Sequence, residues 1–130
     1  MKIGHLALWT YDLERLRDFY CHYFNAKSNE KYVNPAKQFS SYFLSFEDGD
    51  CRIELMHQAT RQIPEYQIGN KIGELAHFAI SVDSKMAVDL LTEQLRNDGY
   101  KIVGEPRLTG DGCYESIICD PDGNMVEITM

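Results

Sequence analysis

Long apolar runs, positive charge and paired cysteines are all scarce in this sequence, and each absence excludes a class of protein. No apolar run approaches the roughly 18 residues that a membrane span needs. The N-terminal sequence passes directly into patterned segments, so we expect no signal peptide. With 13 Lys and Arg against 20 Asp and Glu, the net charge is −7. Phosphate backbones and anionic lipids repel such a chain, which excludes nucleic acid and membrane surfaces as partners.

The four cysteines form no Cys-x-x-Cys pair. A chain of 130 residues can bury a sizeable core without disulfides. We therefore interpret the cysteines as reduced thiols of a cytoplasmic protein, with one of them as a nucleophile as a minor alternative. Length and composition predict a single globular domain over residues 1–130.

The hydrophobic pattern predicts the same order of elements twice, a strand, a helix and three strands. In the first half the strands are expected at 3–10, 28–33, 39–46 and 51–56, with a helix at 13–24 capped by Asp12. In the second half the strands are expected at 74–82, 100–104, 113–119 and 125–129, with a helix at 85–98 capped by Ser84. The apolar face of the second helix is expected to comprise Ala87, Leu90, Leu91 and Leu95. The fold class is therefore α+β, with two βαβββ modules, about 1–57 and 74–130, joined by a linker at 58–73 and forming a cupped mixed sheet.

The two modules also match residue by residue. His5-Leu-Ala-Leu aligns with His77-Phe-Ala-Ile, and the segment that ends at Glu54 aligns with the segment that ends at Glu127. Both glutamates follow an Asp-Gly turn signal. A duplicated unit with like titratable residues at matching places predicts a site with pseudo-two-fold symmetry.

Strand alternation predicts where these four side chains point. His5, Glu54, His77 and Glu127 each alternate with apolar neighbours, so all four are expected on the sheet face away from the helices. A carboxylate in an apolar strand is costly unless it is paired or bound to a metal. An ion pair of Glu54 with Arg52 is one alternative, and a single strand histidine is usually structural. Two imidazoles and two carboxylates together favour one divalent ion, which can be Zn, Ni, Co, Fe(II) or Mn.

These features resemble the vicinal oxygen chelate superfamily, which contains glyoxalase I, fosfomycin-resistance proteins, bleomycin-binding proteins, methylmalonyl-CoA epimerase and extradiol dioxygenases. The resemblance covers the whole chain and depends on the paired modules, on His5, on His77-Phe-Ala-Ile-Ser-Val-Asp and on the Asp-Pro-Asp-Gly-Asn-Met-Val-Glu sequence that ends at Glu127. It implies the glyoxalase-like fold. The ligand order His, Glu, His, Glu looks like that of glyoxalase I (lactoylglutathione lyase), and His5, Glu54, His77 and Glu127 fall on those four places.

The activity that this resemblance implies is proton transfer next to a carbonyl. The candidate substrate is the hemithioacetal that methylglyoxal forms with glutathione. A divalent metal would polarise its oxygens and stabilise an enediolate. Glu127 is the first choice as base, with Glu54 as its partner. Members of the superfamily commonly pair, so a homodimer is expected, with modules combining within one chain or between two.

Two positions depart from glyoxalase I. Trp9 stands four residues after His5, where a short glyoxalase I commonly has an arginine that meets a glutathione carboxylate. Trp9 is expected to line the cup and suits an apolar or aromatic substrate. The lysine that is common in the Gly-rich turn is replaced near Thr109, and Arg107 is the nearby cation. Trp9 and Arg107 are thus the candidate substrate-binding residues.

Other interpretations stay open. The chain can instead be another metal-dependent member, such as a thiol transferase, an epimerase or an extradiol dioxygenase, or a protein that binds a drug or metabolite without turnover. Among the remaining side chains, His57 is expected to point away from the metal and His22 to lie at the surface. The facing of Tyr42 is left open.

Overall fold

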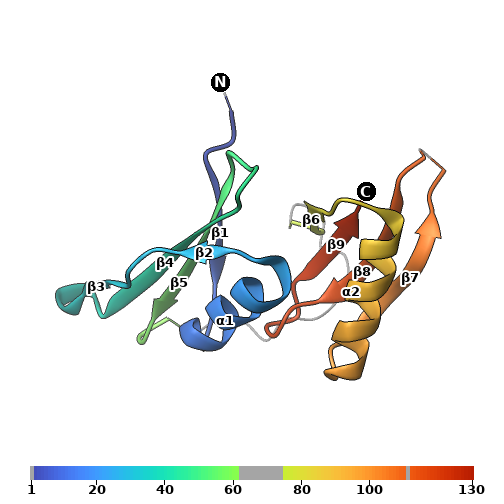
Figure 1. Cartoon of the computed structure of the whole chain (residues 1–130). Helices are drawn as coiled ribbons and strands as arrows, with labels where there is room; N and C mark the ends of the chain where they lie inside the picture. The colour runs from blue at the N-terminus through green and yellow to red at the C-terminus, as the bar shows by residue number, and fades with distance from the viewer. Residues whose placement is uncertain (1, 62–74, 111) are drawn as a thin grey trace. The chain divides into compact units, whose positions relative to one another are not determined.

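Each half of the chain forms its own compact unit in the computed structural model, which describes residues 2–61, 75–110 and 112–130 (Figure 1). The first unit is Met1–Glu65 and the second is Tyr66–Met130. Most of the linker expected at 58–73 lies outside the described residues. Both units contain a mixed sheet and one α-helix, which confirms the α+β class.

The first unit has a mixed sheet with strand order β1-β5-β4-β2, and β3 also pairs with β4. β1 is parallel to β5, and the other pairs are antiparallel. Helix α1 lies against the sheet over β4 and β5 (Figure 1). The elements are β1 (His5–Trp9), α1 (Leu13–Phe24), β2 (Lys27–Ser28), β3 (Tyr32–Asn34), a short 3-10 helix η1 (Pro35–Lys37), β4 (Phe39–Ser45) and β5 (Arg52–Gln58).

The second unit repeats this plan in a four-stranded sheet of order β6-β9-β8-β7. β6 is parallel to β9, whereas β8 is antiparallel to both β9 and β7. Helix α2 packs on β7, β8 and β9 (Figure 1). The elements are β6 (Phe78–Ser81), α2 (Lys85–Asn97), β7 (Ile102–Leu108), β8 (Tyr114–Cys119) and β9 (Met125–Thr129).

The expected elements all form, with changes at some ends. Helix α1 and strand β9 have the expected bounds. Strand β6 is shorter than the strand expected at 74–82. Residue 74 of that expected strand lies outside the described residues. β7 continues to Leu108 through two register shifts, and therefore runs beyond the expected end at 104. The segment expected as one strand at 28–33 forms the two short strands β2 and β3. No helix among the described residues is long and apolar enough to cross a membrane.

Local capping explains why both helices begin where the sequence predicts. The side chain of Asp12 accepts a hydrogen bond from the backbone N–H of Arg15, and that of Ser84 accepts one from Ala87. Helix α1 ends at Asn25, which adopts the left-handed conformation with φ of 52°. These bonds satisfy N–H groups that have no partner inside the helix.

The cores lie between each helix and its sheet. In the second unit, Val88 and Leu95 of α2 are fully buried together with Thr92, whose hydroxyl donates to the Val88 carbonyl at 2.7 Å. The prediction that Leu90 belongs to this face is wrong, because its side chain is 65% exposed. Each helical residue turns the chain by about 100°, which places Leu90 roughly opposite Val88.

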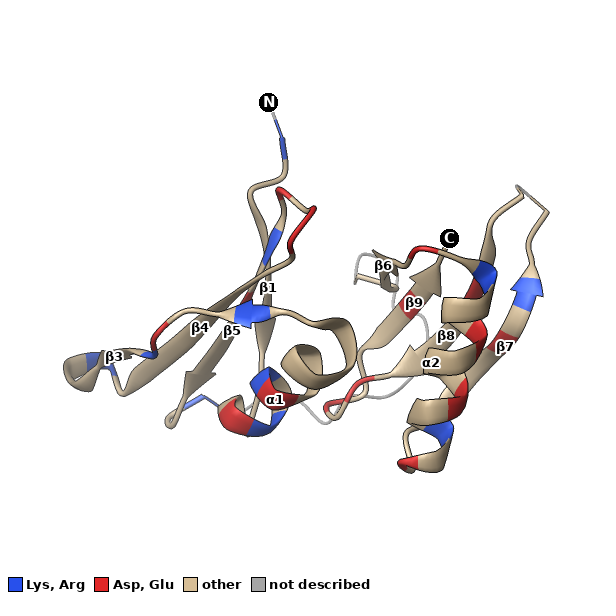
Figure 2. Ribbon diagram, viewed as in Figure 1, with Lys and Arg blue, Asp and Glu red and all other residues tan. Residues whose placement is uncertain are grey.

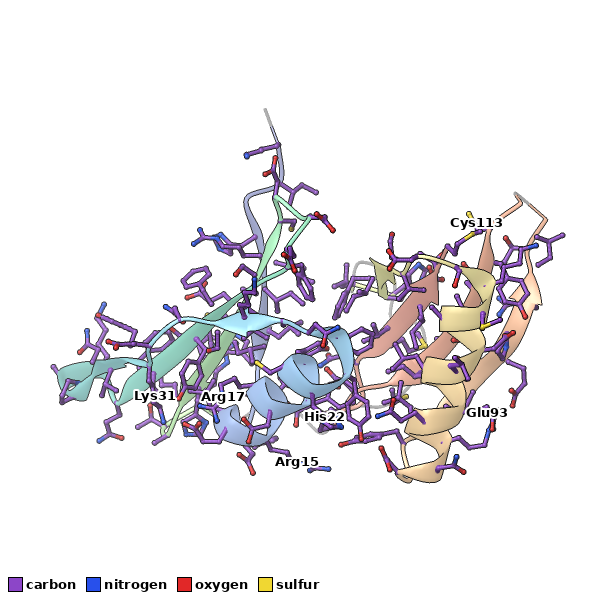
Figure 3. The ribbon with its side chains drawn as sticks, in the orientation of Figure 1. Arg15, Arg17, His22, Lys31, Glu93 and Cys113 are labelled. Atoms are coloured by element: carbon purple, nitrogen blue, oxygen red, sulfur yellow. The ribbon has the colours of Figure 1, made fainter. Side chains whose placement is uncertain are left out.

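Several ion pairs lie at exposed or partly exposed positions of both units. Figure 2 shows residues of both signs along α2 and β7, where Arg96 pairs with Glu93 and Glu105. Figure 3 shows Arg17 and Lys31 of the first unit near each other. Both pair with Glu14, at 2.8 and 2.7 Å. The hydrogen bond from Lys31 lowers the pKa of the Glu14 carboxyl.

Candidate metal centre

The first unit brings together one of the expected histidines and one of the expected glutamates. Nε2 of His5, at the start of β1, lies 3.6 Å from Oε2 of Glu54 in β5. The His5 side chain is 45% exposed and that of Glu54 is 18% exposed. The neighbours of Glu54, Ile53 and Leu55, are buried toward the helix. Strand alternation therefore turns Glu54 to the opposite face, as the sequence predicts.

The second unit builds the same pair. Nε2 of His77, just before β6, lies 3.2 Å from Oε1 of Glu127 in β9. Their side chains are 45% and 15% exposed, close to the values in the first unit. Val126 and Ile128 are fully buried on the helix side, so Glu127 also points to the opposite face.

The backbone register explains why the two pairs are alike. In the parallel ladder of β1 and β5, Glu54 is opposite Ala7, two residues after His5. In the ladder of β6 and β9, Glu127 is opposite Ala79, two residues after His77. Each histidine is thus displaced by the same step along the strand from its glutamate, and both lie on one face.

The third strand of each sheet makes the two half-sites different. Phe43 of β4 is opposite Glu54, and its ring meets the His5 ring edge-to-face at 5.5 Å. Ile117 of β8 is opposite Glu127 at the matching place. An aromatic ring therefore borders the first pair, whereas an aliphatic side chain stands beside the second.

The donor atoms of both pairs fit a divalent ion in their chemistry, and those of the His77–Glu127 pair also fit it in their spacing. Metal–nitrogen and metal–oxygen distances of about 2.0–2.2 Å place two neighbouring ligand atoms about 2.9–3.4 Å apart. The His77–Glu127 separation of 3.2 Å lies in this range, and the His5–Glu54 separation of 3.6 Å is slightly longer. Within the described ranges, no group of three or more His, Cys, Asp or Glu side chains comes together. Each unit offers two candidate ligand side chains.

Trp9 lies in β1 on the face of His5, as strand alternation predicts. Its ring meets that of Phe39 edge-to-face at 6.2 Å. The guanidinium carbon of Arg61 lies 4.1 Å from the centre of the Trp9 ring. The sequence does not single out Arg61, because a single arginine after a strand carries no pattern that assigns it to Trp9.

Arg107 is held by an acidic residue on its own sheet. Its guanidinium lies 3.3 Å from Oε1 of Glu115, which faces it across the β7–β8 ladder. Gly104 leaves room for this side chain, since an added Cβ there would lie 3.0 Å from Nη1 of Arg107. Glu115 and Glu127 lie on the same face of their strands, so Arg107 is a fixed cation on the Glu127 face.

Several other side chains lie away from this face. Nδ1 of His57 donates to the Thr10 carbonyl at 3.0 Å, and His22 is exposed on α1, where Figure 3 labels it. Tyr42 lies on the helix side of β4, where its hydroxyl hydrogen-bonds to Glu14 at 3.1 Å. Phe43, and not Tyr42, is therefore the β4 residue that lies beside Glu54 on its face.

Burial does not activate either of the thiols of Cys21 and Cys119 as a nucleophile. Burial raises the pKa of Cys21 and that of Cys119. A higher pKa leaves less of the reactive thiolate at neutral pH. The alternative of a nucleophilic cysteine therefore gains no support from these two residues.

Comparison with known proteins agrees with this architecture. Residues 2–128 match the family described as "Glyoxalase/Bleomycin resistance protein/Dioxygenase superfamily". A lactoylglutathione lyase of Haemophilus influenzae is 28% identical over 128 residues, which cover 98% of this chain and 90% of that protein. Glyoxalase I of Zea mays is 30% identical with a TM-score of 0.77, and the match covers 98% of this chain but 44% of the maize chain. A domain from Frankia sp. EAN1pec has a TM-score of 0.82 at 18% identity, over 100% of this chain and 97% of that one, which shows a shared fold.

Proposed function

The chain belongs to the Glyoxalase/Bleomycin resistance protein/Dioxygenase superfamily, and from this premise we propose that it is a metal-dependent lyase of the glyoxalase I type. Its reaction is proton transfer next to a carbonyl of a small molecule. The observation that carries the proposal is the pair of His–Glu contacts at matching register in the two units.

His5, Glu54, His77 and Glu127 would together hold one divalent ion. Two carboxylates and two neutral imidazoles balance its charge, and the mixed nitrogen and oxygen set suits Ni, Zn, Co, Fe(II) or Mn. When bound, the ion supplies a Lewis acid for the negative charge that develops on the carbonyl oxygen. The two pairs come from one chain or from two copies in a homodimer.

The two glutamates carry the proton transfer. Glu127 takes the proton from the carbon next to the carbonyl, and the C–H electron pair moves toward the carbonyl oxygen. A proton then returns to the former carbonyl carbon from Glu54, from Glu127 or from water, while the hydroxyl proton on the first carbon passes to the former carbonyl oxygen. The product is an isomer of the substrate, so no oxidant is consumed. Both carboxylates have limited exposure, at 15% and 18%, which favours transfer to the substrate over exchange with bulk water.

The substrate that we propose is the hemithioacetal of methylglyoxal and glutathione. The lactoylglutathione lyase names of the relatives support this choice. Arg107 offers a cation on the Glu127 face for an anionic group. A second candidate function is turnover or sequestration of an aromatic small molecule, which the rings of Trp9, Phe39 and Phe43 on the His5 face favour.

The test begins with protein stripped of metal and reloaded separately with nickel, cobalt, zinc or manganese. Thioester formation from methylglyoxal and glutathione is then followed for wild type and Glu127→Gln. We expect turnover with at least one metal and a loss of about 10²- to 10⁴-fold in kcat for the variant, the range for removal of a general base. Glu105→Gln is the matched control, because Glu105 is a strand glutamate of the same unit that pairs with Arg96 on the surface.

Each outcome of this assay is decisive. Turnover that needs metal and is lost in Glu127→Gln alone supports the proposal. Tight metal binding without thioester formation would remove the hemithioacetal as substrate and leave the aromatic candidate. Equal activity in metal-free and loaded protein would refute the metal-dependent mechanism.

A further inference from the structure

Arg61 is fixed in place although it lies beyond the last residue of β5. Its backbone N–H donates to the Gln58 carbonyl at 3.0 Å, which closes a turn. Two residues earlier, the backbone N–H of Ala59 donates to the Gln38 carbonyl at 3.2 Å, and the Gln58 side chain donates to the Lys37 carbonyl at 3.1 Å. The turn that carries Arg61 is thereby tied to the segment just before β4.

The Arg61 side chain lies against a prearranged aromatic surface. Its guanidinium carbon is 4.1 Å from the centre of the Trp9 ring. The Trp9 ring is itself braced at an angle of 84° by Phe39, which in turn contacts Tyr32 at 6.2 Å. A guanidinium stacked in this way uses its flat face for the ring and keeps its N–H donors, which point outward in the plane, for an acceptor.

No carboxylate occupies those donors among residues 2–61, 75–110 and 112–130. Three other arginines of the described chain have such partners, with Arg17 on Glu14, Arg96 on Glu93 and Arg107 on Glu115, whereas Arg15 and Arg52, the latter stacked on Phe43, pair with no carboxylate in these ranges. In a protein of net charge −7, an arginine that is stacked yet has no acidic partner in the described ranges is open to an external anion.

We propose that Arg61, positioned by Trp9, binds a carboxylate of the substrate. This inference rests on the proposed function in one respect, which is that the reacting end of the substrate lies at the His5–Glu54 pair. Trp9 and His5 are four residues apart on one strand face, which corresponds to roughly 13 Å. A ligand that reaches from the His5–Glu54 pair to Arg61 is therefore an elongated thiol conjugate with a carboxylate at its far end, and free methylglyoxal is too short.

Trp9 also provides the measurement, because it is the only tryptophan of the chain and so the only source of tryptophan fluorescence. The probe is S-methylglutathione, which carries the carboxylates but has no reacting carbonyl. It is compared with its diethyl ester, which lacks the negative charges. The variants are Arg61→Gln and Arg61→Lys. Arg15→Gln is the matched control, because it makes the same change in charge on the exposed side of α1 (Figure 3).

In wild type we expect S-methylglutathione to change the Trp9 emission and to bind about tenfold more tightly than its diester, the strength of a charge-assisted hydrogen bond at a partly exposed site. Arg61→Gln should lose this preference, Arg61→Lys should keep part of it, and Arg15→Gln should keep all of it. In turnover, Arg61→Gln should raise KM and leave kcat unchanged, which a general structural defect would not do.

Two results would overturn the inference. One is an unchanged preference for the charged probe in Arg61→Gln, and the other is wild-type protein that binds probe and diester equally. The proposed function fails separately. If the protein distinguishes probe from diester through Arg61 but makes no thioester with any metal, then the carboxylate site stands and the lyase activity does not.

Discussion

A histidine series tests whether both units contribute to one metal centre. The chain has four histidines, of which His5 and His77 are the proposed ligands. His22 is exposed on α1, and His57 donates to a backbone carbonyl on the helix side. Replacing each by Gln removes one imidazole at a time, and His22→Gln is the matched control because its side chain has no part in either pair.

The expected size of the effect follows from the chain length and from mass action. At a free metal concentration about 100 times Kd, binding stabilises the folded protein by about 2.7 kcal/mol. An unfolding entropy of about 2.1 cal/mol/K per residue, applied to 130 residues, converts this to a rise in Tm of about 10 °C. Loss of one ligand should weaken binding by about 100-fold or more, since even outer partners of ligands contribute 10- to 100-fold. The rise then shrinks to about 1.5 °C or less.

The assay is thermal unfolding followed by circular dichroism. Metal-free protein is compared with the same protein in nickel or zinc at a free concentration about 100 times Kd. Wild type and His22→Gln should show the full rise in Tm, whereas His5→Gln and His77→Gln should each lose most of it. The Tm of the metal-free variants should change little, because both ligand side chains are 45% exposed.

A metal centre shared by both units is refuted if only one of the two variants loses the rise in Tm. In that case one unit would bind the metal alone, and the matching register of the two pairs would be a relic of duplication without a shared site. A full rise in both variants would refute the metal centre altogether.

Three further predictions concern the scaffold. Thr92→Val should cost about 1–3 kcal/mol, because it leaves the buried Ser116 hydroxyl, 2.7 Å away, without its acceptor; adding Ser116→Ala should recover part of this loss in denaturant unfolding. Leu95→Ala should cost about 2–5 kcal/mol, whereas Leu90→Ala should stay within about 0.5 kcal/mol, since only Leu95 is buried. Glu14→Gln should cost no more than about 1 kcal/mol at neutral pH, because the ion pairs are partly exposed and screened. The lowered pKa of Glu14 stabilises the fold above the unfolded-state pKa, so the difference from wild type should vanish as the pH falls through the lowered value.

The elements that the sequence predicts well are those with local signals. Helix α1 begins at a capping Asp12 and ends at Asn25, and both act through bonds to residues within the same helix or its next turn. β7 was predicted too short, because its register shifts depend on pairing with β8 and leave no local mark. Leu90 was misplaced because neighbouring leucines at 90 and 91 give two possible apolar faces, and only packing against the sheet selects between them.

The facing of β4 shows the same limit more clearly. Tyr42, Phe43 and Leu44 are all apolar or aromatic, so alternation gives no answer about which of them shares the face of Glu54. The pairing of Phe43 with Glu54 decides it and sends Tyr42 to the helix side. A shift of the ladder by one residue would have reversed the result.

By itself the sequence determined the duplication of the module and the direction of four side chains, His5, Glu54, His77 and Glu127. Strand alternation has a period of two residues, so the apolar neighbours of each polar residue are enough to define its face. Tertiary structure alone decided the distance within each His–Glu pair and the contact of Trp9 with Arg61. These depend on which strands are neighbours and in what register, a property of long-range pairing that no local pattern contains.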